Sequence, residues 1–231
     1  MLNLTRFKVL TFDCYGTMID WESGIFAALR PILAAHNKEM SDSALLALYA
    51  DLELAAEQGE YLRYRDVLQL VVRGFGERLG FAPTDAEVRS LPQSVATWQP
   101  FPDSVESLHK LSSHYQLAVM SNIDDDLFAA TASKLEVAFS NVITAQQAGC
   151  YKPCMNIFRL TEKRIGVSRG QWLHVGQSIY HDVIPAQSLG LATVWVNRRS
   201  PRPGAGAAKM AVATPDLEVP DLHTLAKLAE N

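Results

Sequence analysis

The sequence predicts an α/β protein with a doubly wound, mostly parallel sheet and an all-helical segment inserted after the first strand. Two observations support this prediction. From Phe101 onward, short apolar runs alternate with helical patterns, an order typical of right-handed β-α-β units. Between residues 18 and 98, apolar residues recur at helical spacing and no strand pattern interrupts them.

The first strand is expected at residues 8–12, a β-branched and apolar run followed by Asp13. The inserted helices begin near Ser23 and continue to about Trp98, with Ser41 as a helix cap and Gly80 as a stop. Further helices are expected at residues 104–114, 124–135, 156–165 and 182–189, and strands at residues 117–120, 141–144, 172–175 and 192–196. Composition indicates a flexible loop at residues 200–206, and residues 214–230 form an extended piece and a closing helix.

This order predicts two domains. A core domain consists of residues 1–17 and 99–231, and a helical cap domain consists of residues 18–98. The length of 231 residues and the hydrophobic fraction of 48% are sufficient for a buried core.

Composition also limits the partners. The net charge of −4 and the scattered Lys and Arg residues argue against nucleic-acid binding. No apolar run approaches the roughly 20 residues that span a bilayer, and the first strand begins too early for a secretory segment to precede it. We therefore expect a cytoplasmic protein with neither nucleic acid nor membrane as a partner.

The three cysteines do not indicate a disulfide framework, because their number is odd. Cys150 and Cys154 flank Lys152, but no second Cys or His pair accompanies them, so no zinc site is expected. Cys14 is expected to be a small wall residue beside Asp13.

Polar residues follow the predicted strands: Asp13, the pair Ser121 and Asn122, Lys152 and Asp182. Each has an ordinary structural interpretation, as a turn or cap residue, a solvated lysine or a first-turn acid. Because the carboxyl ends of parallel strands meet at one edge of a sheet, we expect these side chains to share a site.

Four motifs carry a resemblance to a known family: Phe-Asp-x-Tyr-Gly-Thr at 12–17, Met-Ser-Asn at 120–122, Tyr-Lys-Pro at 151–153, and Val-Gly-Gln-Ser through Asp182 at 175–182. In this order and spacing they resemble the haloacid dehalogenase superfamily over nearly the whole chain. The resemblance implies a Rossmann-like core with a helical cap. It also implies that Asp13 is a nucleophile that forms a covalent ester or an acyl-phosphate.

Two positions depart from the magnesium-dependent phosphotransferases of that superfamily. Tyr15 stands where those enzymes carry an acid/base aspartate, and Gln177 replaces an acid that helps to hold the metal. Magnesium prefers a shell of oxygen ligands that includes carboxylates. We therefore expect no metal and no other cofactor, and a magnesium phosphatase is a less favoured alternative.

With Tyr15 at this position, the sequence resembles the 2-haloacid dehalogenase branch of the superfamily, whose nucleophile attacks a carbon atom of the substrate. A halide leaves as a stable anion, so displacement by Asp13 requires no general acid. By resemblance, Lys152 holds the nucleophile and Asp182 orients the water that opens the ester. The implied activity is that of an (S)-2-haloacid dehalogenase acting on a small carboxylate with water. Residues expected to bind the substrate are Tyr15, Thr17, Trp21, Ser121, Asn122, Tyr151, Ser178 and Tyr180.

Other interpretations stay open. The dehalogenases carry a cap arginine, whereas residues 48–53 offer none. Arg63 and Arg65 either replace it from the cap or are solvated, and we favour solvated positions. The strings at 19–21, 143–146 and 178–182 also resemble L-azetidine-2-carboxylate hydrolases, in which the leaving group is an amine. Trp21 either encloses the cavity or packs at the hinge, and Tyr151 has the same two interpretations. A binding protein without catalysis is the third class, and a homodimer is one use of the apolar cap helices.

Overall fold

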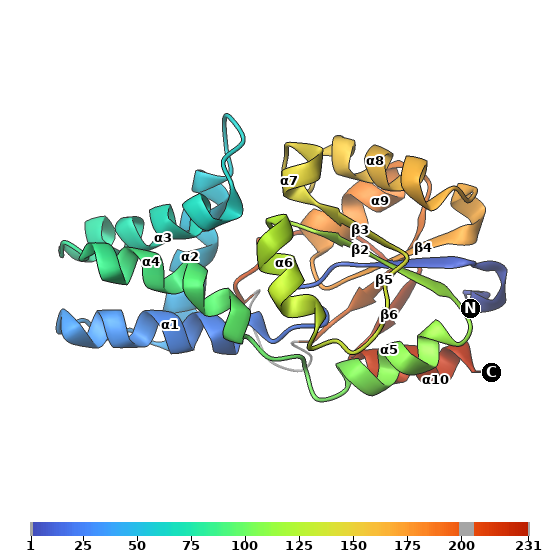
Figure 1. Cartoon of the computed structure of the whole chain (residues 1–231), viewed down its shortest axis with the longest axis horizontal. Coiled ribbons are helices and arrows are strands. Elements are labelled where there is room, and N and C mark those ends of the chain that lie inside the picture. The colour runs from blue at the N-terminus through green and yellow to red at the C-terminus, as the bar shows by residue number, and fades with distance from the viewer. Residues whose placement is uncertain (1, 199–205, 231) are drawn as a thin grey trace.

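One parallel sheet forms the centre of the protein in the computed structural model, which describes residues 2–198 and 206–230 (Figure 1). Its strand order is β3-β2-β1-β4-β5-β6, and every described pair of neighbours is parallel. The strands are β1 (Val9–Phe12), β2 (Gln116–Ser121), β3 (Asn141–Thr144), β4 (Trp172–Gly176), β5 (Ala192–Val196) and β6 (Leu217–Val219). The predicted fold class is therefore confirmed.

Helices cover both faces of the sheet. In Figure 1, α8 and α9 lie on one side of the sheet, and α5 and α10 lie together on the other. The helices of this region are α5 (Ser104–Ser112), α6 (Asp125–Ala132), α7 (Ala145–Ala148), α8 (Met155–Ile165), α9 (Ile184–Ser188) and α10 (Leu222–Ala229). The chain moves outward from β1 to β3 and then crosses to β4 on the other side of β1, which makes the ends of β1 and β4 the topological switch point.

The inserted segment is helical, as predicted. It contains α1 (Trp21–Ala35), α2 (Asp42–Ala56), α3 (Tyr64–Leu79) and α4 (Asp85–Ser94), which lie beside the end of the sheet where β1 finishes (Figure 1). Ser41 caps α2 by accepting the Ala44 N–H, and Gly80 ends α3 with a left-handed φ of 72°. We propose that residues 18–98 form the cap domain.

Cap and core share one hydrophobic cluster. The ring of Tyr15, just after β1, packs edge-on against Trp98 at a centroid distance of 5.7 Å. Gly24 on α1 packs directly on the same indole, since an added Cβ would lie 2.3 Å from it. This close contact fixes α1 over the end of β1.

Several details differ from the sequence predictions. The helix expected from residue 182 begins earlier as a π-helical turn, Ile179–Val183, before α9. No disulfide was expected, yet Cys150 and Cys154 are bonded, because the turn between them brings their Cα atoms to 6.2 Å, a distance that a disulfide spans. Most of the predicted loop at 200–206 lies outside the described residues. No helix in the described ranges combines the length and the apolar character that crossing a membrane requires.

Candidate active site

Asp13 lies directly after β1, at the switch point of the sheet. Its backbone N–H donates to Val175 O at 2.9 Å, which extends the pairing with β4 by one residue. The turn that follows requires Gly16, whose φ is 89° and whose added Cβ would lie 3.0 Å from the Trp21 indole nitrogen. The turn returns the Thr17 hydroxyl to Asp13, where it donates to Oδ2 at 2.7 Å.

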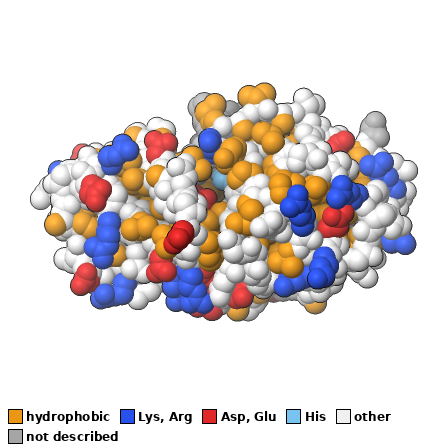
Figure 2. Space-filling model, turned by 90° about the horizontal axis from the view of Figure 1, so that it is seen from above, with side chains coloured by type: hydrophobic (Ala, Val, Ile, Leu, Met, Phe, Trp, Pro, Cys, Tyr) orange, Lys and Arg blue, Asp and Glu red, His pale blue; other side chains and the backbone are white. Residues whose placement is uncertain are grey.

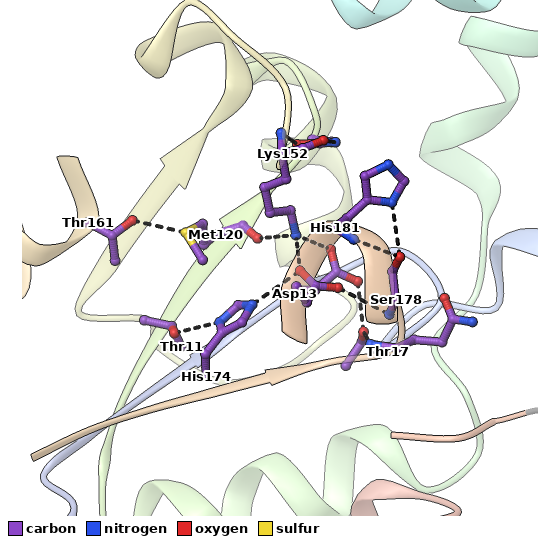
Figure 3. A network of polar contacts seen from close by, with 12 residues as sticks. Thr11, Asp13, Thr17, Met120, Lys152, Thr161, His174, Ser178 and His181 are labelled. Atoms are coloured by element: carbon purple, nitrogen blue, oxygen red, sulfur yellow. Dashed lines mark hydrogen bonds and ion pairs between the residues drawn. The ribbon is translucent and has the colours of Figure 1, made fainter. Parts of the chain in front are cut away.

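Lys152 joins the two carboxylates of the site (Figure 3). Its Nζ donates to Asp13 Oδ1 at 2.8 Å, to Asp182 Oδ1 at 2.7 Å and to Met120 O at 3.0 Å. The side chain is 2% exposed, so all three ammonium hydrogens have protein partners in a nearly dry environment. Asn122 fixes the loop behind it, because its side chain accepts the Lys152 N–H at 2.7 Å and donates to Lys152 O at 3.2 Å.

Asp182 is fully buried and bound from several sides. Besides Lys152, its Oδ1 accepts a hydrogen bond from His174 Nε2 at 3.1 Å, and its Oδ2 accepts the Ser178 N–H at 3.2 Å. Gly176 makes room for the carboxyl group, because an added Cβ would lie 2.5 Å from it. The segment 175–182 therefore both supplies the Asp182 carboxylate and holds it in place.

Burial and charge shift the pKa values of these three groups. Burial raises the pKa of Asp13, an effect that Lys152 opposes. For Asp182 burial also acts upward, but Lys152 and His174 outweigh it and lower the pKa. Burial acts to lower the pKa of Lys152, yet the two carboxylates raise it above its usual range. Lys152 is thus a permanent cation between two carboxylates.

A small cavity of about 50 Å³ opens over Asp13 between core and cap. Figure 2 shows the corresponding hollow, in which acidic and histidine atoms are visible among hydrophobic side chains. By this measure one water needs about 10–15 Å³, so the cavity admits only a small ligand. Its lining includes eight predicted site residues, Asp13, Tyr15, Trp21, Ser121, Asn122, Lys152, Ser178 and Asp182.

The remaining predicted residues lie elsewhere. Thr17 holds Asp13 from behind the cavity, and its oxygen accepts the Gln177 N–H at 2.9 Å. Tyr151 and Tyr180 line a neighbouring cavity of about 240 Å³, beside the disulfide. Tyr151 donates its hydroxyl hydrogen to Leu62 O at 2.8 Å, which joins the Lys152 loop to the segment before α3.

The cap contributes two acids that sequence reasoning missed, Glu53 and Glu57. Glu53 is 8% exposed, and its Oε1 accepts the hydroxyl hydrogens of Tyr49 at 2.9 Å and Tyr64 at 2.7 Å. Burial raises its pKa to about 7, although both tyrosines oppose the shift. Burial and the neighbouring Glu53 raise the pKa of Glu57 well above its ordinary value. Residues 48–53 stood out only for their lack of arginine.

No arginine is among the residues that line the described cavity over Asp13. Arg63 is exposed, as predicted, whereas Arg65 is half-buried and bonds Asp124 and Asp126 at the start of α6. Two other polar atoms in the lining have no hydrogen-bond partner among the described residues, Ser121 Oγ and His181 Nε2. Burial lowers the pKa of His181 to about 4, so this imidazole is neutral at neutral pH.

Comparisons with known proteins found relatives that match most of the chain. The chain is 26% identical over 232 residues to an (S)-2-haloacid dehalogenase of Pseudomonas sp. strain YL, covering 96% of this chain and 94% of that protein. It is 27% identical over 208 residues to (S)-2-haloacid dehalogenase 4A of Burkholderia cepacia, covering 85% of each.

The fold is shared with the L-2-haloacid dehalogenase of Xanthobacter autotrophicus, solved with chloropropionic acid covalently bound. The TM-score is 0.79 at 22% identity, with 97% of this chain and 98% of that one covered. The profile of the haloacid dehalogenase-like hydrolases matches residues 7–190, which is most of the chain. The protein described by this sheet, this cap and this Asp13 site therefore belongs to the haloacid dehalogenase-like hydrolases.

Proposed function

We propose that this hydrolase acts at the α-carbon of a small 2-substituted carboxylic acid through a covalent Asp13 ester, without a metal, and that an (S)-2-haloacid is its default substrate. The observation that carries the proposal is the setting of Asp13. Its carboxylate faces a small cavity and is held by Lys152 and Thr17. The hydroxyl of Tyr15, at the position of the acid/base in phosphotransferases, is hydrogen-bonded to Thr131 at 2.8 Å.

In the first step, an Asp13 oxygen attacks the α-carbon of the substrate. The new C–O bond forms as the carbon–halogen bond breaks, and the halide leaves with the electron pair. Burial leaves the carboxylate poorly solvated and so favours attack, while Lys152 and Thr17 keep it ionised and aligned. The unpaired Ser121 hydroxyl and His181 Nε2 are available to the substrate carboxylate.

In the second step, water attacks the carbonyl carbon of the Asp13 ester. Asp182 accepts the proton that this water loses and returns it to the alkoxide that leaves as the product hydroxyl. Asp13 is regenerated as a carboxylate, and one proton passes to solvent with the halide. Lys152, 2.8 Å from Asp13 Oδ1 in the resting site, is placed to stabilise the oxyanion of the tetrahedral intermediate.

Halide release from L-2-chloropropionate in excess chelator tests this proposal. We expect release by the wild-type protein and none by Asp13→Asn, with intact mass showing that the asparagine has not deamidated. Turnover by an intact Asp13→Asn protein, or release of phosphate from aryl phosphates that chelator abolishes, would contradict it.

A second candidate is the ring opening of L-azetidine-2-carboxylate by the same nucleophile. The observation that favours it is the acidic cap wall, since Glu53 and Glu57 face the cavity and no arginine joins them among the described lining residues. Carboxylates suit a protonated ring nitrogen better than a halide. Attack by Asp13 would break the carbon–nitrogen bond, the nitrogen would take the electron pair, and the freed amine would then gain a proton from the acid pair or water.

Formation of a primary amine from L-azetidine-2-carboxylate distinguishes this candidate. If it holds, Glu53→Gln should lower kcat/KM for the azetidine more than for L-2-chloropropionate. Equal losses for the two substrates would count against a role of the acid pair in amine recognition.

Two expectations from the sequence remain proposals, a cytoplasmic location and a homodimer. The dimer can be measured by light scattering on the purified protein. A monomer at all accessible concentrations would exclude it.

A further inference from the structure

We propose that His174 is a positioning residue for hydrolysis of the ester, and that it acts through a buried hydrogen-bond relay from Trp172 and Thr11 to Asp182. The inference rests on the proposed function, in which Asp182 handles the attacking water. His174 lies on β4 and is 1% exposed, and it does not line the cavity over Asp13. Nothing in the two chemical steps above uses it directly.

The relay is continuous from Trp172 to Asp182, and Figure 3 shows its Thr11 and His174 members beside Asp13. The Trp172 indole N–H donates to Thr11 Oγ1 at 2.7 Å. Thr11 Oγ1 lies 2.8 Å from His174 Nδ1, and His174 Nε2 lies 3.1 Å from Asp182 Oδ1. Trp172, Thr11, His174 and Asp182 are all 0–1% exposed, so water does not compete for these bonds.

The two ends of the relay determine where its protons lie. An indole N–H can only donate, and the Asp182 carboxylate, held ionised by Lys152, can only accept. His174 Nε2 must therefore carry a proton and donate it to Asp182. Its Nδ1 then accepts the Thr11 hydroxyl hydrogen, while Thr11 Oγ1 accepts from Trp172. Every donor and acceptor along the line is used once in this arrangement.

The relay matters most after the ester has formed. In the resting site, Lys152 is shared between Asp13 and Asp182. Alkylation removes the charge of Asp13, so the balance of forces on Lys152 and Asp182 changes. Two contacts that involve neither Asp13 nor Lys152 then hold the Asp182 carboxyl group in place, the His174 Nε2–H on Oδ1 and the Ser178 N–H on Oδ2. His174 thus holds the water-binding group during the second step and has little to do in the first.

Three variants isolate this role. His174→Phe keeps a planar ring for the edge contact with Phe158, at 5.7 Å, but removes both hydrogen bonds. His174→Gln keeps an N–H donor that can reach Asp182. Thr11→Val preserves shape and removes the hydroxyl that bonds His174 Nδ1 and accepts the Trp172 N–H.

Rapid quench and intact-mass analysis measure the two steps separately. We expect His174→Phe to slow ester hydrolysis by about 100-fold, the cost of a displacement of about 1 Å, while ester formation changes by less than about threefold. The covalent adduct then accumulates, and His174→Gln restores most of the hydrolysis rate. Thermal unfolding verifies that each variant is folded. Equal slowing of both steps in a folded His174→Phe protein, or no accumulation of adduct, would overturn the proposal.

A second readout does not depend on turnover. Nitrogen-15 NMR of the wild-type protein should show a slowly exchanging Nε2–H on His174, and His174→Phe assigns the signal by removing it. Thr11→Val removes the hydrogen bond to Nδ1 and should shift the Nδ1 signal, while Nε2–H stays bonded to Asp182. An Nδ1–H tautomer in the wild type would contradict the relay. If the wild type neither forms adduct nor turns over substrate, the proposed function fails, and the tautomer still decides whether the relay exists.

Discussion

Lys152→Met is the sharpest test of the electrostatics at the site. Methionine keeps the length and most of the apolar stem of lysine but cannot donate hydrogen bonds. The substitution removes bonds to Asp13 Oδ1, Asp182 Oδ1 and Met120 O, at 2.8, 2.7 and 3.0 Å. In the wild type, Asp13 and Asp182 both accept hydrogen bonds from the Lys152 ammonium. The variant therefore leaves two buried negative charges close together without the cation that they share.

Removing one partner of a buried ion pair costs about 3–5 kcal/mol. At about 2–4 °C per kcal/mol for a chain of this size, the midpoint of thermal unfolding should fall by about 6–20 °C at neutral pH. The loss should depend on pH. Without Lys152 the pKa of Asp13 rises further above 3.8, the ordinary value that it recovers on unfolding. A raised carboxyl pKa contributes stability below the unfolded value, and this stability is lost as pH rises through the folded value.

Urea unfolding between about pH 4 and about pH 8 measures this effect. We expect wild type and Lys152→Met to converge at the acidic end and to separate as pH rises. The matched control is Lys152→Met combined with Asp13→Asn, which removes one of the two charges and should recover much of the lost stability at the higher pH. A single variant within about 1 kcal/mol of wild type at about pH 8 would refute the reasoning, because it would mean that the carboxylates do not depend on Lys152.

Three other substitutions give separate tests. Gly176→Ala places a Cβ 2.5 Å from the Asp182 carboxyl group. We expect the free energy of urea unfolding to fall by about 1–3 kcal/mol and turnover to be lost. Normal turnover would contradict the conclusion that Gly176 makes room for this carboxylate. Glu53→Gln removes a carboxyl group whose pKa is raised from 4.5 to about 7 by folding. The wild type should therefore lose about 3 kcal/mol of folding stability as pH rises between those values, and the variant should not. Parallel plots of unfolding free energy against pH for the two proteins would refute this. Tyr15→Phe leaves the Thr131 hydroxyl without its 2.8 Å partner, with an expected cost of about 1 kcal/mol, and an unchanged unfolding midpoint would contradict it.

Much of the fold could be predicted because the sheet is buried on both faces. A strand such as Val9–Phe12 is then buried at every position and mostly apolar, and the pattern marks its limits. The helical insertion was predictable for a similar reason, since Ser41 and Gly80 are local signals that act within one turn. The disulfide between Cys150 and Cys154 was not predictable, because it depends on how the loop around Lys152 folds back and not on the number of cysteines.

Some residues of the site could likewise be predicted from the order of the strands, whereas others depend on tertiary packing. Asp13, Lys152 and Asp182 could be grouped from sequence because each follows a strand of one parallel sheet, and topology alone brings those positions together. Glu53 and Glu57 have no such constraint. Their position over Asp13 depends on the packing of α2 against α3 and on the angle between cap and core, and an acid on a helix is by default a solvent-facing residue. The core of the site, to which we assign the proposed chemistry, is therefore determined by strand order, whereas the cap wall, to which we assign substrate selection, is determined by tertiary packing. For this reason the sequence predicts the nucleophile more securely than it predicts the leaving group.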